Sequence, residues 1–211
     1  MTNTDESNEI EEPAAAADGL APARPRGMFA KALERGQRAK FTEPVPATAR
    51  EQVQYLLGKV KGGTRALAKR LGVSQRTVQR YAKGTITTPR ADTREAMAED
   101  TAAQWQPEVR AAVRTQAATA GLVIHIKCEF GFSSSRKGAT DDPRVRILRE
   151  RVSGAAAAEI LAAQESGADE SDLHELVAAA LAESYFTLGG TRADGLQVTL
   201  RDVWYCDFVF D

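Results

Sequence analysis

The sequence predicts an α+β protein in which an N-terminal all-α helix-turn-helix module is followed by a smaller α+β region with an antiparallel sheet. Up to about residue 120, apolar residues recur with the period of a helix, whereas after Gly121 they alternate with the period of a strand. Residues 64–84 add the glycine and the capping residue of a helix-turn-helix. We therefore expect a helical region at 28–118 and an α+β region at 119–211.

The first 27 residues differ from the rest in composition. Residues 1–27 combine acidic side chains with an alanine- and proline-rich stretch and hold almost no large apolar residue. Such a segment buries too little apolar surface to fold, so we expect a disordered acidic tail. The tail could compete with nucleic acid for a basic segment, or it could simply keep the chain soluble.

Residues 64–84 carry the local signals of a helix-turn-helix. Gly72 suits the left-handed turn that ends the first helix, because residues with a Cβ adopt that conformation only at a cost. Ser74 is a good N-cap for the second helix, and Val78 and Tyr81 form the apolar face of that helix. The chain is therefore expected to change direction between two packed helices.

The other face of the second helix is polar and basic. Residues 31–90 hold 14 bases and 3 acids, a net charge of +11 in a chain whose net charge is −1. A basic excess of this kind is typical of phosphate binding, although a solvated surface hairpin is the alternative. The side chains suited to base edges and phosphates in a major groove are Ser74, Gln75, Arg76, Thr77, Gln79, Arg80 and Lys83.

Further helices are predicted on both sides of this motif. An apolar stripe predicts a helix from about Thr48 that stops at Gly62-Gly63. Pro107 is suited to open a later helix, in which Arg110 and Arg114 share one face. That face could reach a backbone phosphate or could be an ordinary solvated surface.

The C-terminal region reads as strands and helices. The alternation of apolar residues predicts three strands, at 122–132, 145–152 and 196–210. His125 falls on the mixed face of the first strand and is expected to be a surface histidine. Two alanine-rich helices are expected between the last two strands. Ser153 is suited to cap the first of these helices.

The cysteines and histidines predict no metal site. Cys128 and Cys206 are far apart in sequence, and each lies in an apolar stretch, which favours buried free thiols. Two histidines complete no recognisable spacing of metal ligands. No apolar run approaches the roughly 20 residues of a membrane span, so we expect a cytoplasmic, reducing environment.

Several features follow one another along the chain in a specific order. They are the helix-turn-helix, Trp105-Gln106-Pro107, the strand from Gly121, Ala139-Thr140-Asp141-Asp142 in the loop 133–142, and Tyr185-Phe186 with Gly189-Gly190. In this order, from about Met28 to the C-terminus, the chain resembles the telomere terminal proteins of linear actinobacterial chromosomes and plasmids. The acidic extension departs from the shorter start of that family, and Ala139 stands where the family commonly has serine.

The resemblance implies a DNA-binding protein that is joined covalently to the 5′ ends of a linear replicon and primes terminal DNA synthesis. It implies that the Thr140 hydroxyl attacks the α-phosphorus of a deoxynucleotide and displaces pyrophosphate. Asp141 and Asp142 would accept the proton or help place a metal, or they would only shape a turn. Ser133, Ser134 and Ser135 are competing acceptors in the same loop.

The resemblance also implies partners. The chain would be the substrate of a DNA polymerase and not itself an enzyme, with no stably bound cofactor and with Mg²⁺ in the polymerase. Telomeric DNA and a telomere-associated DNA-binding protein are the other implied partners, self-association is possible, and DNA ends in the nucleoid are the expected location.

Two other functional classes compete with this one. The alternative is a helix-turn-helix transcription regulator or partition protein whose C-terminal region binds a partner or dimerises. An enzyme that acts alone is disfavoured, because the sequence has no nucleophile elbow, phosphate loop or paired-histidine site.

Overall fold

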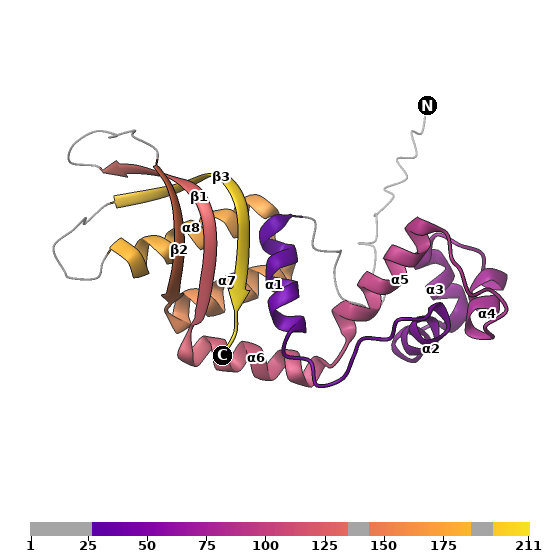
Figure 1. Ribbon diagram of the computed structural model, residues 1–211. Helices are drawn as coiled ribbons and strands as arrows, with labels where there is room; N and C mark the ends of the chain where they lie inside the picture. The colour runs from indigo at the N-terminus through magenta and orange to yellow at the C-terminus, as the bar shows by residue number, and fades with distance from the viewer. Residues whose placement is uncertain (1–26, 135–143, 187–195) are drawn as a thin grey trace, which may run out of the picture.

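The computed structural model describes residues 27–134, 144–186 and 196–211 (Figure 1). This part of the chain is α+β, as predicted, and its elements are α1 (Met28–Arg38), α2 (Ala49–Lys59), α3 (Gly63–Leu71), α4 (Gln75–Ala82), α5 (Ala91–Gln104), α6 (Pro107–Ala120), β1 (Leu122–Ser134), β2 (Arg144–Val152), α7 (Gly154–Ser166), α8 (Glu170–Phe186) and β3 (Leu196–Val209). The predicted acidic tail falls outside the described residues, apart from Gly27.

The helices α2 to α5 form a small helical module around a core of their own. Thr48 caps α2 in a capping box with Glu51, and Gly62, with a φ of 101°, precedes α3. The buried side chains of the module come from all four helices and include Ala49, Val53, Leu56, Val60, Leu67, Ala68, Leu71, Val78, Tyr81, Ala96 and Met97. The helical module lies to the right of the sheet in Figure 1.

The three strands form one antiparallel sheet in the order β2-β1-β3, which confirms the predicted strands. Ile126 of β1 is paired with Leu148 on one side and with Cys206 on the other. All three of these side chains are buried. The central strand therefore presents one fully apolar face, as its alternating sequence predicts.

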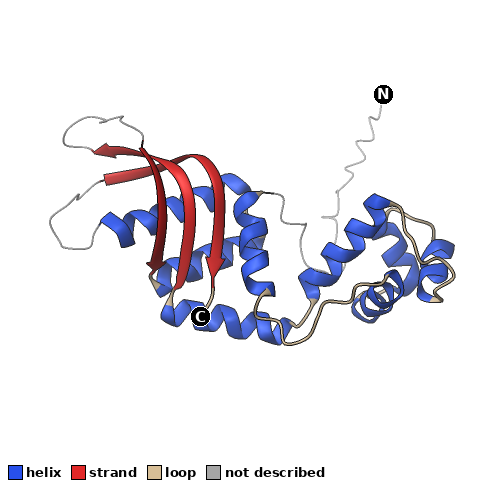
Figure 2. Ribbon diagram, viewed as in Figure 1, coloured by secondary structure: helices blue, strands red, loops and turns tan. Residues whose placement is uncertain are grey.

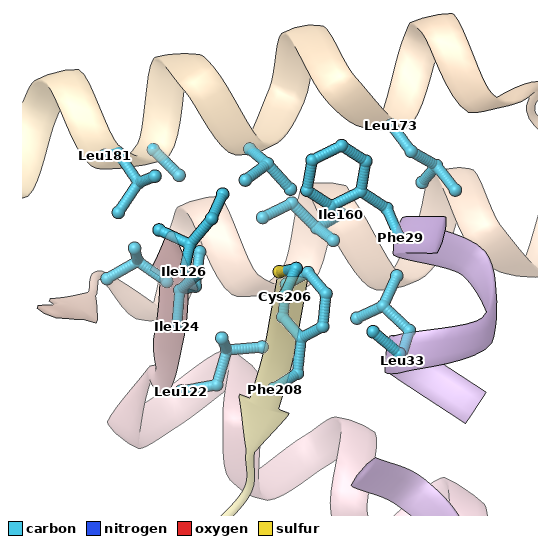
Figure 3. Close-up of a cluster of buried hydrophobic side chains, with 14 of the residues drawn as sticks. Phe29, Leu33, Leu122, Ile124, Ile126, Ile160, Leu173, Leu181, Cys206 and Phe208 are labelled. Carbon is cyan, nitrogen blue, oxygen red and sulfur yellow. The ribbon is translucent and has the colours of Figure 1, made fainter. Parts of the chain in front are cut away.

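Helices cover that apolar face. In Figure 2 the helices α7 and α8 lie behind the sheet, and Figure 3 shows Ile124 and Ile126 beside Leu181 of α8, with Ile160 of α7 in the same cluster. The helix α1 packs along β3, and α6 packs against α7. We call this larger unit, formed by α1, α6, α7, α8 and the three strands, the sheet half.

The boundary between the two units differs from the one that the sequence predicted. The sequence placed α1 and α6 in a helical region at 28–118, but their apolar side chains Phe29, Leu33, Val113 and Ala117 belong to the core of the sheet half. Gly36 allows α1 to approach β3 closely, since a Cβ there would lie 2.3 Å from the carbonyl oxygen of Phe208. Long-range packing therefore assigns both helices to the sheet half.

Arg110 joins the two units and is not a phosphate ligand on a solvated face. Its guanidinium is buried, donates to the Glu34 carboxylate at 2.6 and 3.0 Å, and donates to the carbonyl oxygen of Ala102 at 2.6 Å. It also donates to Gln37 at 2.8 Å and lies 5.0 Å from the Phe41 ring. Arg110 therefore ties α1 and α6 to the end of α5. Arg114 is half-buried and pairs with Glu165 at 3.4 Å.

The same junction sets the ionisation of Glu34. Burial raises the pKa of Glu34, but the hydrogen bonds and charges of Arg110 and Arg38 outweigh that effect and hold the pKa below its ordinary value. Glu34 therefore stays ionised beneath the surface, where its two arginine partners compensate the lost hydration.

Both cysteines are buried free thiols, as predicted. Burial raises the pKa of Cys128 to about 12 and also raises the pKa of Cys206, where the nearby charge of Asp207 adds to the effect. Their role is therefore that of small apolar side chains in the core. None of the helices in the described ranges has the length and apolar character to cross a membrane.

Candidate nucleic-acid interface

The turn between α3 and α4 is built as the sequence predicted. Gly72 has a φ of 64° and ends α3 in the left-handed conformation. The N–H of Val73 then bonds to the carbonyl oxygen of Ala68 at 3.0 Å. The Ser74 hydroxyl accepts from the N–H of Thr77 at 3.1 Å, which confirms Ser74 as the N-cap of α4.

Packing fixes which face of α4 is turned outward. Val78 and Tyr81 are buried and belong to the same core as Leu67 and Leu71 of α3. These α4 residues are three apart and so share one side of the helix. The opposite side of α4 is consequently held in solvent by the fold of the helical module.

Six of the seven predicted contact residues are exposed on α4 and at its ends, and Thr77 is half-buried. Arg76 and Arg80 are one helical turn apart, as are Gln79 and Lys83. These four side chains make no hydrogen bond or ion pair within the described part of the chain. Their guanidinium, ammonium and amide groups form two adjacent rows, which could contact base edges in a DNA groove or the phosphate backbone.

Ser74, Gln75 and Thr77 also have structural contacts. Besides capping α4, as the sequence predicts, Ser74 contacts the Thr77 hydroxyl at 2.8 Å within the first turn of the helix. The Gln75 amide donates to Thr64 of α3 at 2.8 Å, which joins α4 to α3. The sequence carries no signal for this second contact, because it depends on how the two helices pack.

Charge is concentrated in this part of the helical module. Residues 49–90 contain ten bases and a single acid, Glu51. Arg70 of this set bonds to Asp100 of α5 at 2.8 and 3.1 Å and so anchors α3 to α5. Arg65 and Lys69 are exposed on α3, the helix that precedes α4, and they add to the positive charge of the module surface. Such a surface attracts phosphates.

The candidate acceptor Thr140 and its neighbours Asp141 and Asp142 lie outside the described residues, and so does Ser135. Ser133 and Ser134 are described in their backbone as the last residues of β1. The structure also describes the ends that flank this segment, because Phe130 is paired with Arg144 at the start of β2. The last residue of β1 and the first residue of β2 therefore lie at the same end of the sheet.

The other residues that carry the resemblance have structural contacts. Trp105 donates to the carbonyl oxygen of Glu43 at 3.1 Å and packs edge-on against Tyr55. Gln106 has a φ of 46° and bonds to Thr42, and Pro107 begins α6. Tyr185 accepts from Arg146 at 3.2 Å. Gly189 and Gly190 lie outside the described residues.

Metal ligands do not gather anywhere in the described ranges, where no group of three His, Cys, Asp or Glu side chains is placed to hold an ion. Comparisons with family models, with curated proteins and with solved structures found no match to the chain.

Proposed function

We propose that this protein is a DNA-binding terminal protein that is joined through Thr140 to the 5′ ends of linear replicons and primes terminal DNA synthesis. The observation that carries the DNA-binding part is the solvent-facing side of α4, with Arg76, Gln79, Arg80 and Lys83 exposed on a capped helix of a basic module. The priming part rests on the resemblance of the chain to telomere terminal proteins.

In the proposed reaction, the Thr140 oxygen attacks the α-phosphorus of an incoming deoxynucleotide. A phosphoester bond forms, the bond to pyrophosphate breaks, and the hydroxyl proton passes to a base in the polymerase site. The 3′-OH of the attached nucleotide then continues the strand. Divalent metal in the polymerase stabilises the charge on the phosphorus, so this chain contributes the nucleophile and its delivery.

The proposal assigns a separate task to each unit. The helical module holds the DNA, and the sheet half provides the priming segment, which lies in sequence between the paired strands β1 and β2. The partners are telomeric DNA, a DNA polymerase and a telomere-associated DNA-binding protein, and the location is at DNA ends in the nucleoid. The buried Arg110 junction would keep the two tasks in a fixed relation.

Covalent labelling tests the priming part. The protein is incubated with a polymerase, terminal DNA and a labelled deoxynucleotide, then denatured and separated. Label retained on the wild type and on Ser135→Ala but lost in Thr140→Val supports Thr140 as the acceptor. Label that persists in Thr140→Val would move the acceptor to another hydroxyl, and the absence of label under every condition would overturn priming.

Duplex binding tests the role of α4. Arg76→Ala and Arg80→Ala should each weaken binding, and each phosphate contact removed should lower the slope of log affinity against log salt by about one. Arg114→Ala, on α6 outside the helical module, is the matched loss of one positive charge and should leave binding unchanged. Duplex binding through α4 without any covalent label would favour the transcription regulator or partition protein instead.

A further inference from the structure

One face of the sheet is left open by the helices. The helices lie on the side of Leu122, Ile124 and Ile126, and Figure 1 shows the other side of the strands turned away from them. The open face consists of the odd-numbered residues 123–129 of β1 with their neighbours on β2 and β3. On β1 these residues are half-buried, as expected for a central strand without a covering layer.

Exposed apolar side chains gather on this open face. The exposed large apolar residues of the described chain are Met28 and four residues of the strands, namely Val145 at 55%, Ile147 at 61%, Trp204 at 51% and Val209 at 40% exposure. The register places Val145, Ile147 and Val209 opposite the odd-numbered residues of β1. Ile147 and Trp204 both lie beside Lys127, with Val145 next along β2, whereas Val209 lies at the other end of the face. Neighbouring exposed apolar side chains of this kind indicate a binding site.

Rings occupy the middle of the open face. The register shifts between Lys127 and Glu129, where β3 has additional residues, and such a bulge brings consecutive side chains to one side. Trp204 lies beside Lys127, whose Nζ is 5.5 Å from the centre of the indole ring. Tyr205 packs edge-on against His125 with its hydroxyl 2.8 Å from Nε2, so the surface histidine expected from the sequence is a half-buried partner of a tyrosine.

Positive charge surrounds the rings. Lys127 lies at the centre of the open face, and the exposed Arg149 is paired in register with His125. Two acids lie on the same face. Asp207, on the opposite side of His125, is paired with Arg35 of α1 at 2.5 Å, and Glu129 lies opposite Arg201 of β3 in the register. Exposed rings next to bases are the pattern with which proteins hold a nucleic-acid strand, by stacking on the bases and pairing with the phosphates.

The side chains of the open face suit a strand of nucleic acid better than a second copy of the chain. Charged residues are depleted in the core of an interface between two copies, whereas Lys127 and Arg149 stand among the rings of this face. A few stacked bases and phosphate contacts suffice to hold a single strand of nucleic acid.

We propose that the open face of the sheet binds single-stranded nucleic acid. Bases stack on Trp204 and on the Tyr205–His125 pair, and Lys127 and Arg149 bind phosphates. This activity goes beyond duplex binding by α4 and beyond priming by Thr140, and it requires neither of them. It would give the protein two separate nucleic-acid surfaces, one on the helical module and one on the sheet half.

The test uses the full-length chain and a fluorescently labelled dT12 oligonucleotide, whose binding is followed by anisotropy. Wild type should bind it. Trp204→Ala should weaken binding by about tenfold or more, whereas Trp204→Phe, which keeps a ring, should retain most of the affinity. The double variant Lys127→Ala/Arg149→Ala should lower the salt slope by about 1.4. Arg76→Ala/Arg80→Ala, on α4, should leave dT12 binding intact while it weakens duplex binding.

Three results would overturn the proposal. Wild type that does not bind dT12 would exclude this surface as a single-strand site. Binding that survives Trp204→Ala but is lost in Arg76→Ala/Arg80→Ala would place the oligonucleotide on α4. Self-association in sedimentation that Trp204→Ala abolishes, together with unaltered dT12 binding in that variant, would show that a second copy covers the open face.

Discussion

The helical module and the sheet half differ in how far apart in sequence their contacting residues lie. In the helical module, the caps at Thr48 and Ser74 join residues three positions apart. In the sheet half, Glu170 accepts from the N–H of Phe29, 141 residues away, at 2.7 Å, and Arg35 pairs with Asp207. The module is thus defined by short segments of sequence, whereas the sheet half needs both ends of the described chain.

This difference places the sensitive point of the molecule where the two units meet. The junction at Arg110 uses α1 and α6 from the sheet half and the last turn of α5 from the module. Local signals hold each helix, whereas this buried cluster, the aromatic pair Tyr55–Trp105 and the bonds of Gln106 to Thr42 link one unit to the other. Variants of the junction should therefore cost more stability than variants within either unit.

The largest effect is expected for Arg110→Ala. The change leaves the buried Glu34 carboxylate without its main partner and removes one of the two donors to the Ala102 carbonyl oxygen, which should cost about 3–5 kcal/mol in the free energy of unfolding. Urea denaturation followed by circular dichroism measures it. Arg114→Ala removes the same charge one turn away, from a weak pair with Glu165, and should cost less than about 1 kcal/mol. Equal losses would show that the junction does not couple the units.

The pH dependence of stability gives a smaller effect from the same junction. The folded pKa of Glu34 lies below its ordinary value of 4.5, because the arginines outweigh the opposing effect of burial. The stabilisation is therefore fully present above the unfolded pKa and is lost as the pH falls through the lower, folded pKa.

Glu34→Gln removes this titration and tests the sign. Wild type should lose more stability than Glu34→Gln between pH 6 and pH 3, measured by thermal unfolding at each pH. Glu165→Gln, at an exposed surface pair, is the control and should follow wild type. A steeper acid loss in Glu34→Gln than in wild type would contradict a lowered pKa.

Alanine variants of two glycines compare a closely packed position in the sheet half, Gly36, with an open position in the helical module, Gly58. A Cβ at Gly36 would lie 2.3 Å from the Phe208 carbonyl oxygen and 2.8 Å from the Phe210 ring, so Gly36→Ala must push α1 away from β3 and should cost about 1–3 kcal/mol. Gly58, inside α2, has nothing within 4 Å of its Cβ position. Gly58→Ala should therefore stabilise by about 0.5–1 kcal/mol, because the unfolded chain loses freedom. Urea midpoints that shift in the same direction would refute the contrast.

The same contrast of range explains how far the sequence predicted the structure. Gly72 and Ser74 are specific to a turn and a cap, so the helix-turn-helix was predicted with its buried face. The placement of α1 and α6 was not predicted. An apolar stripe indicates that one side of a helix is buried, but it does not indicate which element covers that side. Arg110 shows the same limit, since a basic residue on a helix reads as exposed until Glu34 is placed beside it.

The candidate sites were predictable to different degrees. The basic side of α4 follows from the apolar side that the sequence displays, and Arg76 and Arg80 are exposed as expected. The Trp204–Lys127 contact depends on an irregular strand pairing that alternation does not reveal. Thr140 as the nucleotide acceptor stays a prediction, since it lies outside the described residues.

The smallest effect is expected for variants of Ser74. They distinguish its role as the cap of α4 from the DNA contact that the sequence predicts for the same residue. Ser74→Ala removes the oxygen that accepts from the Thr77 N–H and should cost about 1 kcal/mol, whereas Ser74→Asn supplies another capping oxygen and should cost almost nothing. Urea denaturation measures both. Because the hydroxyl is engaged in the cap, duplex affinity should be the same for Ser74→Asn and wild type, measured by anisotropy. Full stability with a tenfold loss of affinity in Ser74→Asn would show that Ser74 contacts DNA directly, which would extend the interface from the outer side of α4 to its first turn.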